Sequence, residues 1–304
     1  MKKLTALILA CILLWGCASA ELNIVCSLFP QYDFTRIIAG DKANVTQLLP
    51  LGTDSHEFEP SAREILATDR ADLFIYTDDE LETWVLTMKD GFTHVKTVRC
   101  AEGIDLEALN EEWEELSGEE HEESEHHTHA YDAHIWLDPT LAIQMCENIR
   151  DALIEEDGEN EAYYTENCAA LVSEIQVLDA DFTALFAEHP DATLYFGGKF
   201  AYSHFIRHYG LNYLSAYSDC SDEGEPGART IVAIINQIGA SGASVIFTDE
   251  LSLGEVAKEI ARETGCEVLL FHTCHNLSKA EGDKSYIDIM RQNLENIKIA
   301  LEGE

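Results

Sequence analysis

Basic residues are scarce in this 304-residue chain. It contains 19 lysines and arginines and 57 aspartates and glutamates, which gives a formal net charge of −38 at pH 7. A surface this negative repels the phosphates of nucleic acids and raises the local concentration of cations. The composition therefore argues against a nucleic-acid partner and favours a positively charged ligand, although part of the charge serves solubility.

Several motifs that mark zinc-ribbon, redox or hydrolytic proteins are also missing. The nine cysteines include no Cys-x-x-Cys pair, so neither a zinc ribbon nor a thioredoxin motif is supported. The chain has no His-Glu-x-x-His motif and no Gly-x-Ser-x-Gly motif. An exported zinc hydrolase, the main alternative from another functional class, therefore lacks the general base that its chemistry requires.

Only the N-terminus carries a long apolar run. Residues 4–15 follow a basic start and are too few to span a bilayer as a retained helix, a pattern typical of export signals. Leu14-Trp-Gly-Cys17 resembles a lipoprotein cleavage site, whereas Ala18-Ser-Ala20 resembles an ordinary one. We expect residues 1–20 to be a lipoprotein-type signal region. The mature protein would then lie in the periplasm or on the cell surface, held to the membrane by a lipid on Cys17.

The rest of the chain alternates short β-branched or apolar runs with helical stretches. This alternation predicts parallel sheets flanked by helices. The expected strands are residues 23–29, 43–49, 72–76, 95–100, 193–196, 211–217, 244–248 and 267–271, with a closing helix at 286–301. The expected fold class is therefore α/β, with two lobes that each contain a mostly parallel sheet.

A long helix is expected between the two halves. Residues 161–188 contain neither proline nor glycine, and their apolar residues recur at steps of three and four. We expect residues 161–189 to form a rigid link between an N-terminal lobe (21–160) and a C-terminal lobe (190–304). The alternative is an ordinary surface helix within one domain.

An acidic, histidine-rich loop covers residues 104–131 of the N-terminal lobe. Its carboxylates and imidazoles cannot bury themselves, but they can hold a cation such as zinc. We expect this loop to gather metal ions. The alternative is a disordered, solubilising insert whose histidines have no special role.

One histidine stands out on each side of this loop. His56 lies in residues 52–60, between an expected strand and a helix, where open α/β sheets place ligands. His134 lies in residues 132–139 at the start of another helix, beside apolar residues that would exclude water. Each is a candidate metal ligand, and the alternatives are a solvated surface histidine and a packed core histidine.

The two segments, Gly52-Thr-Asp-Ser-His-Glu-Phe-Glu-Pro60 and Asp132-Ala-His-Ile-Trp-Leu-Asp-Pro139, resemble those of the zinc and manganese substrate-binding proteins of ABC importers. The resemblance extends to the export signal, residues 24–34, residues 209–211 and residues 285–294. It implies two α/β lobes joined by a long helix, with one metal ion carried in the cleft. We further expect a monomer that is not an enzyme and that delivers its ion to an importer permease.

The resemblance also implies a ligand set. His56 and His134 match two ligand histidines of the family directly. The third position matches Lys199, which cannot bind a metal while protonated, so His204 on the same helix is the expected substitute and Glu225 the alternative.

The fourth family ligand, an aspartate, matches His272. His275 and Glu250 remain alternatives at this position. A shell dominated by histidines favours Zn²⁺ over Mn²⁺, because Mn²⁺ prefers more oxygen donors. An exported zinc chaperone or an adhesin would use the same site, and the sequence does not separate these functions from import.

The cysteines allow one further expectation. Export permits disulfides, and Cys220 and Cys274 both lie in loops expected at the ends of strands, so we expect them to pair. Without Cys11 and Cys17 of the signal region, the number of cysteines is odd. At least one thiol therefore stays free.

Overall fold

The protein is represented by a computed structural model that describes most of the chain. The described residues are 21–56, 58–79, 82–109, 132, 134–220, 224, 226–250 and 252–303. The expected export signal at 1–20, most of the histidine-rich loop (110–131) and the candidate ligand Glu225 lie outside them. Within the described part of the chain, no helix combines the length and the apolar character needed to cross a membrane.

The N-terminal lobe is built on a four-stranded parallel sheet with the order β2-β1-β3-β4. Helices connect the strands, as parallel pairing requires. The described strands and helices of this lobe are β1 (Leu22–Cys26), α2 (Phe29–Ala39), β2 (Ala43–Gln47), α3 (Ala62–Thr68), β3 (Leu73–Tyr76), α4 (Thr83–Lys89), β4 (Lys96–Arg99) and α6 (Pro139–Glu156).

The C-terminal lobe repeats this plan with the strand order β6-β5-β7-β8, again parallel throughout. Its described strands and helices are β5 (Thr193–Phe196), α8 (Ser203–Tyr209), β6 (Asn212–Ser215), α9 (Ala228–Ser241), β7 (Val245–Thr248), α10 (Glu255–Thr264), β8 (Glu267–Leu270) and α11 (Tyr286–Glu302). The predicted α/β fold with two parallel sheets is confirmed.

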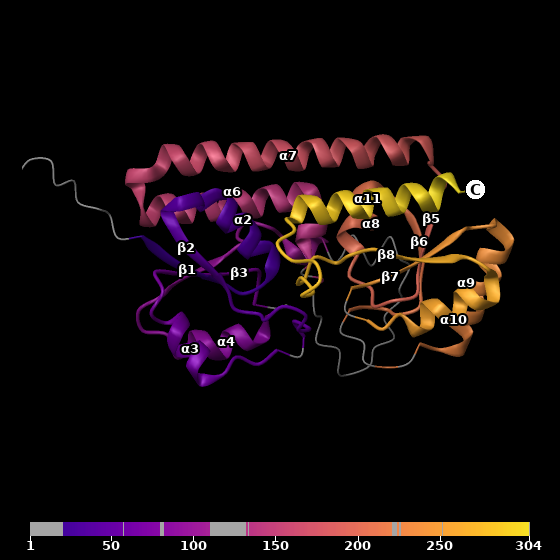
Figure 1. The fold of residues 1–304 in the computed structure, drawn as a ribbon, viewed down its shortest axis with the longest axis horizontal. Coiled ribbons are helices and arrows are strands. Elements are labelled where there is room, and N and C mark those ends of the chain that lie inside the picture. Colours follow the sequence, from indigo (N-terminus) through magenta and orange to yellow (C-terminus); the bar gives the residue numbers. More distant parts are fainter. Residues whose placement is uncertain are drawn as a thin grey trace, which may run out of the picture.

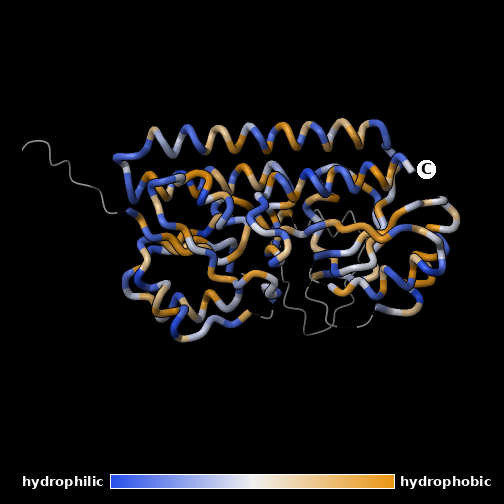
Figure 2. Tube along the Cα trace, in the orientation of Figure 1, coloured by the Kyte–Doolittle hydropathy of each residue, from blue (hydrophilic) through white to orange (hydrophobic). Residues whose placement is uncertain are grey.

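The 28-residue helix α7 (Glu161–Glu188) runs along the top of both lobes (Figure 1). Below it lie α2 and α6 over the N-terminal sheet, and α11 over the C-terminal sheet, while α3, α4, α9 and α10 cover the opposite side (Figure 1). Figure 2 shows the hydrophobic residues concentrated between these helical layers.

The buried face of α7 explains why the helix joins the lobes rigidly. Its apolar residues at three- and four-residue spacing are all buried, and one continuous hydrophobic core contains residues of both lobes together with α7. Near its C-terminal end, Phe182 packs edge-on against Phe205 of α8, with ring centroids 5.1 Å apart. The predicted linking helix is thus confirmed, and it is a packed strut.

A second connection between the lobes follows strand β8. The chain from residue 271 to 285 leaves the C-terminal sheet and crosses to the N-terminal lobe, where backbone and side-chain groups form hydrogen bonds with it. Gly52 N donates to the Leu277 carbonyl (2.8 Å), and the Asn276 side-chain amide donates to the Pro50 carbonyl (2.7 Å). This crossing places residues of the C-terminal lobe beside the loop that follows β2.

Candidate metal centre

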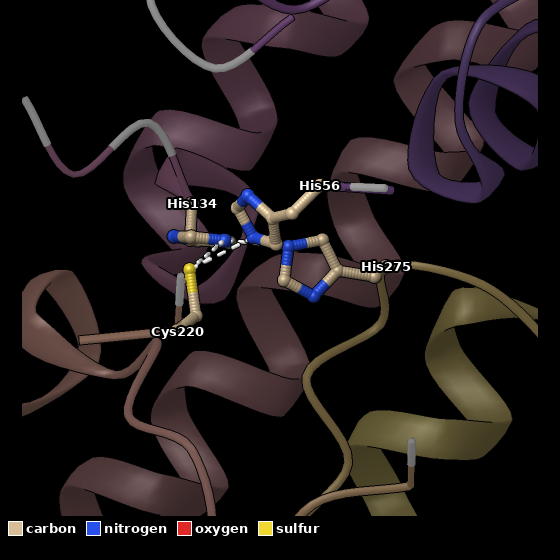
Figure 3. Close-up of side chains that lie close together, drawn as sticks. All are labelled: His56, His134, Cys220 and His275. Carbon is tan, nitrogen blue, oxygen red and sulfur yellow. Dashed lines mark hydrogen bonds between the residues drawn. The ribbon is translucent and has the colours of Figure 1, made fainter. Parts of the chain in front are cut away.

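Four side chains from distant parts of the chain converge where the lobes meet. They are His56, His134, Cys220 and His275, and one potential ligand atom from each lies within 4.8 Å of the others. Figure 3 shows the three imidazoles and the thiol pointing toward a common centre. No other group of three or more histidine, cysteine or carboxylate ligands of this compactness occurs among the described residues.

Each lobe supplies two of these residues. His56 lies in the loop after β2, and His134 precedes the 3-10 turn Ile135–Leu137 that leads into α6. Cys220 lies in the loop after β6, and His275 lies in the crossing segment after β8. Three of the four therefore follow the carboxyl ends of parallel strands, the edge at which open α/β sheets bind their ligands.

The candidate ligand atoms lie slightly closer together than in a tetrahedral zinc site. Cys220 Sγ lies 2.9 Å from His56 Nε2 and 3.3 Å from His134 Nε2, and the Nε2 atoms of His134 and His275 are 2.5 Å apart. Zn–N bonds of about 2.0–2.1 Å and Zn–S bonds of about 2.3 Å place tetrahedral ligand atoms about 3.3–3.6 Å apart. Small outward shifts of these side chains would accommodate the ion.

The loop that carries His134 is held by polar contacts and an apolar wall. Asp132 Oδ1 accepts the backbone N–H of His134 (3.0 Å) and also contacts its Nδ1. Trp136 is fully buried, and its ring packs against both His134 and His275, with centroids 5.3 and 5.4 Å apart. The expected apolar residues that exclude water beside His134 are present, and they contact two of the four candidate ligands.

The loop that carries His56 is tied to the opposite lobe. Asp54 Oδ1 accepts the backbone N–H of His56 (2.9 Å), and Asp54 Oδ2 lies 3.5 Å from the Lys199 ammonium of the C-terminal lobe. Lys199, at the position where a family ligand is expected, thus forms an ion pair across the lobes. His56 is the least buried member of the cluster.

The four groups differ in their proton affinity. Burial and the neighbouring His134 lower the pKa of His56 to about 4, and the same causes hold the pKa of His275 well below its usual value. Although burial opposes it, the Cys220 sulfur and the Asp132 carboxylate raise the pKa of His134. Burial raises the pKa of Cys220. Without a metal at neutral pH, the contacting pair of His134 and Cys220 therefore retains at least one proton.

Zinc binding should for this reason release protons. Ligands must be deprotonated to bind, so we expect about one to two protons per zinc at neutral pH and an affinity that rises by about 10- to 100-fold per pH unit. Calorimetric titrations in buffers with different ionisation enthalpies measure the number. The Cys220→Ser variant should release fewer protons than the wild-type protein, because a serine hydroxyl stays protonated. Zinc binding without proton release would contradict these protonation states.

Two residues predicted as ligands do not join the cluster. His204, on α8, directs its Nε2 to the carbonyl oxygen of Asp132, so it supports the segment that carries His134. His272 points the other way along the crossing segment, with Nδ1 3.4 Å from Glu250 and Nε2 3.3 Å from Glu281. His275, which the sequence left open as an alternative to His272, lies at the cluster instead.

The expectation for Cys220 was wrong. Cys220 and Cys274 are both free thiols, and Cys220 contacts two histidines of the cluster instead of a second cysteine. The odd number of cysteines was a signal that one thiol was available for another role. The local sequence around Cys220 does not show that this thiol meets the histidines.

The chain is similar to known zinc-uptake and zinc-binding proteins. Residues 24–300 match the family described as "Zinc-uptake complex component A periplasmic". The chain is 33% identical to the high-affinity zinc uptake system protein ZnuA of Bacillus subtilis, covering 92% of this chain and 88% of that protein. It is 30% identical to the zinc-binding protein AdcA of Streptococcus pyogenes over 94% of this chain, but it spans only 57% of that relative.

A solved structure shows the same architecture. The crystal structure of the Zn(II)-bound ZnuA-like domain of Streptococcus pneumoniae AdcA is similar to this chain with a TM-score of 0.76 and 26% sequence identity. The match covers 93% of this chain and all of that domain.

Proposed function

This chain belongs to the family of periplasmic zinc-uptake complex component A proteins, and on that basis we propose that it captures Zn²⁺ outside the cytoplasm and delivers it to an ABC importer in the membrane. The family is one of metal-uptake components, in which the ion is cargo. The ion's release at the membrane is then as important as its capture.

The main support for this proposal is that the four candidate ligands come from both lobes. His56 and His134 come from the N-terminal lobe, and Cys220 and His275 come from the C-terminal lobe. An ion held in this way links the two lobes. A small separation of the lobes removes two ligands at once, which provides a route for release that a site within one lobe would lack.

The donor set favours zinc as the cargo. Three imidazole nitrogens and one thiolate form a tetrahedral shell of the kind that zinc prefers, whereas Mn²⁺ prefers oxygen donors and more of them. All four positions are filled by side chains, so no coordination site is kept open for a reactive water, as a catalytic zinc requires. The proposed ligand set is therefore suited to carrying zinc and not to hydrolysis.

The remaining features complete the proposal. A lipid on Cys17 would keep the protein at the membrane, near the importer permease that receives the ion. The histidine-rich loop at residues 104–131 would collect zinc at low affinity and raise its concentration near His56, the most accessible ligand of the cluster. We propose that the protein acts as a monomer, because the two lobes of one chain complete the site.

Zinc titration of the protein produced without residues 1–20 tests the proposal. We expect one tightly bound zinc and several weak ones, measured by competition with a chromogenic chelator. Deleting residues 117–130 should remove the weak sites and preserve the tight one, because no candidate ligand of the cluster lies in that segment. Loss of the tight site in the deletion variant would place the transported ion in the loop and contradict the proposed site.

An uptake assay separates import from the alternatives. An exported zinc chaperone or an adhesin would bind zinc at the same cluster but would not need a permease. If import is its function, cells that lack this protein should grow more slowly than wild-type cells at limiting zinc. In those cells, the Cys220→Ser variant should restore growth less well than the wild-type protein.

A further inference from the structure

Two of the three histidines at the cluster use their second ring nitrogen for a contact that orients the ring. The Nδ1 atom of His134 contacts Asp132, and the Nδ1 atom of His275 lies 2.7 Å from the hydroxyl of Thr273. The contact of His275 is unusual because a hydroxyl stands where a carboxylate or a carbonyl usually does. The second hydrogen-bond partner of the Thr273 hydroxyl therefore decides how firmly the hydroxyl can hold the His275 ring.

Behind Thr273 lies the buried carboxylate of Glu250. The Thr273 hydroxyl lies 2.6 Å from Glu250 Oε1, and the Thr273 backbone N–H donates to Glu250 Oε2 (2.8 Å). The side chains of Glu250 and Thr273 are both buried, so water does not compete for these bonds. Glu250, Thr273 and His275 therefore form a continuous chain that ends at the cluster.

The direction of the hydrogen bonds follows from the number of protons available. Burial raises the pKa of Glu250, but the backbone N–H and the hydroxyl of Thr273 both donate to its two oxygens, which favours the ionised form. The ionised carboxylate only accepts, so the single hydroxyl proton of Thr273 is donated to Glu250. The hydroxyl oxygen can then only accept from His275, which requires a proton on Nδ1. The Nε2 atom of His275, which faces His134 and the centre of the cluster, consequently presents its lone pair to the metal.

The carboxylate of Glu250 is held in turn by the crossing segment. His272 lies between two carboxylates, with Glu250 3.4 Å from its Nδ1 and Glu281 3.3 Å from its Nε2. The backbone of His272 is bonded to α11, because its N–H donates to Asn293 Oδ1 (2.8 Å) and its carbonyl accepts from Asn293 Nδ2 (2.9 Å). His272 Nδ1 accepts the backbone N–H of Cys274 (2.9 Å), so His272 anchors the segment that carries Thr273. The Glu250 carboxylate is held by its two bonds from Thr273.

We propose that Glu250 and Thr273 are positioning residues that set the tautomer and the direction of the His275 ring, and that His272 supports them from outside the metal shell. This inference rests on the proposed function, since it requires a cation bound by His275. It assigns a role to Glu250 and His272 that differs from direct ligation. The relay orients the ligand of the C-terminal lobe before the ion arrives and so strengthens binding.

Paired substitutions at Thr273 isolate the hydroxyl. Thr273→Val replaces the hydroxyl with a methyl group of similar volume, and Thr273→Ser keeps the hydroxyl while removing the methyl group. We expect Thr273→Val to weaken zinc binding by about 10- to 100-fold and Thr273→Ser to stay close to wild type. Glu250→Gln, which removes the carboxylate charge and one acceptor, should weaken binding to a similar extent.

A buried threonine elsewhere provides the matched control. Thr35 on α2 is fully buried, and its hydroxyl contacts Cys26, not a member of the cluster. Thr35→Val should lower the melting temperature of the metal-free protein at most and leave zinc affinity unchanged. The absorption spectrum of bound Co²⁺ gives an independent readout, because a reoriented His275 changes the ligand field in Thr273→Val and not in Thr35→Val.

The outcomes separate the inference from the proposed function. If the wild-type protein binds zinc tightly and Thr273→Val binds it equally well, the relay is wrong and the metal site stands. Equal weakening in the valine and serine variants would also overturn the relay, because it would assign the effect to packing. Absence of tight zinc binding in the wild-type protein would instead overturn the proposed function.

Discussion

Replacing Cys220 with serine is expected to weaken zinc binding by about 100- to 1,000-fold. Structural zinc sites contribute about 10–16 kcal/mol through four ligands, so each ligand accounts for about 3–4 kcal/mol, or two to three powers of ten in affinity. The serine hydroxyl fits the space of the thiol but does not ionise readily, so the shell loses its only anionic donor. Competition with chelators of known affinity measures the change.

The same variant should lose selectivity. A thiolate favours zinc and other borderline or soft cations over Mn²⁺, so the ratio of zinc to manganese affinity should fall in Cys220→Ser. The sulfur-to-metal charge-transfer absorption of the Co²⁺-loaded protein should also disappear. Cys266→Ser is the matched control, because Cys266 is a free thiol that contacts Thr264 at the end of α10. Wild-type affinity in Cys220→Ser would remove the sulfur from the proposed ligand set.

Replacing His275 with alanine is expected to abolish tight zinc binding to a similar or greater extent. His275 is almost completely buried and lies next to His134 at the centre of the cluster. Its loss removes one ligand and leaves a cavity beside the Trp136 ring. The remaining three ligands would bind zinc with an open position, and the measured affinity should fall by at least about 100-fold.

His204→Gln is the informative comparison for His275→Ala. His204 is the ligand that the sequence favoured, yet it contacts the carbonyl oxygen of Asp132, and a glutamine amide can still donate a hydrogen bond there. We expect a change in zinc affinity below about tenfold, since the four cluster side chains are retained. The reverse order, with His204→Gln more damaging than His275→Ala, would restore the ligand set predicted from the sequence.

The secondary structure was largely predictable because its signals are local. The helix expected at 161–188 is α7 (Glu161–Glu188), and the strand expected at 193–196 is β5 (Thr193–Phe196). The other strands differ from their expected bounds by at most three residues at either end. The main error in this part is at residues 27–29, where the expected strand continues but the chain already turns into α2. Pro30 in the first turn of α2 marks that change.

His56 and His134, which both lie at the cluster, were candidates from sequence for a related reason. His56 lies between an expected strand and a helix start, and His134 immediately precedes the apolar residues that lead into a helix, so the position of each at the edge of a lobe follows from neighbouring residues. Cys220 and His275 lack such a local signal. His272 and His275 are three residues apart in an irregular segment, and Cys274 between them has a positive φ of 60°. That backbone turn sends one histidine toward Glu250 and the other toward the cleft.

The amino-acid sequence alone thus determined two α/β lobes, a rigid helix between them and one histidine of the cluster on each side of the acidic loop. These features depend on apolar periodicity and on residues close together in the chain. Only the tertiary structure decided that Cys220 and His275 complete the cluster, and that His204 and His272 do not. Such choices depend on how loops from two separate sheets approach one another across the cleft, and no spacing along the chain encodes that approach.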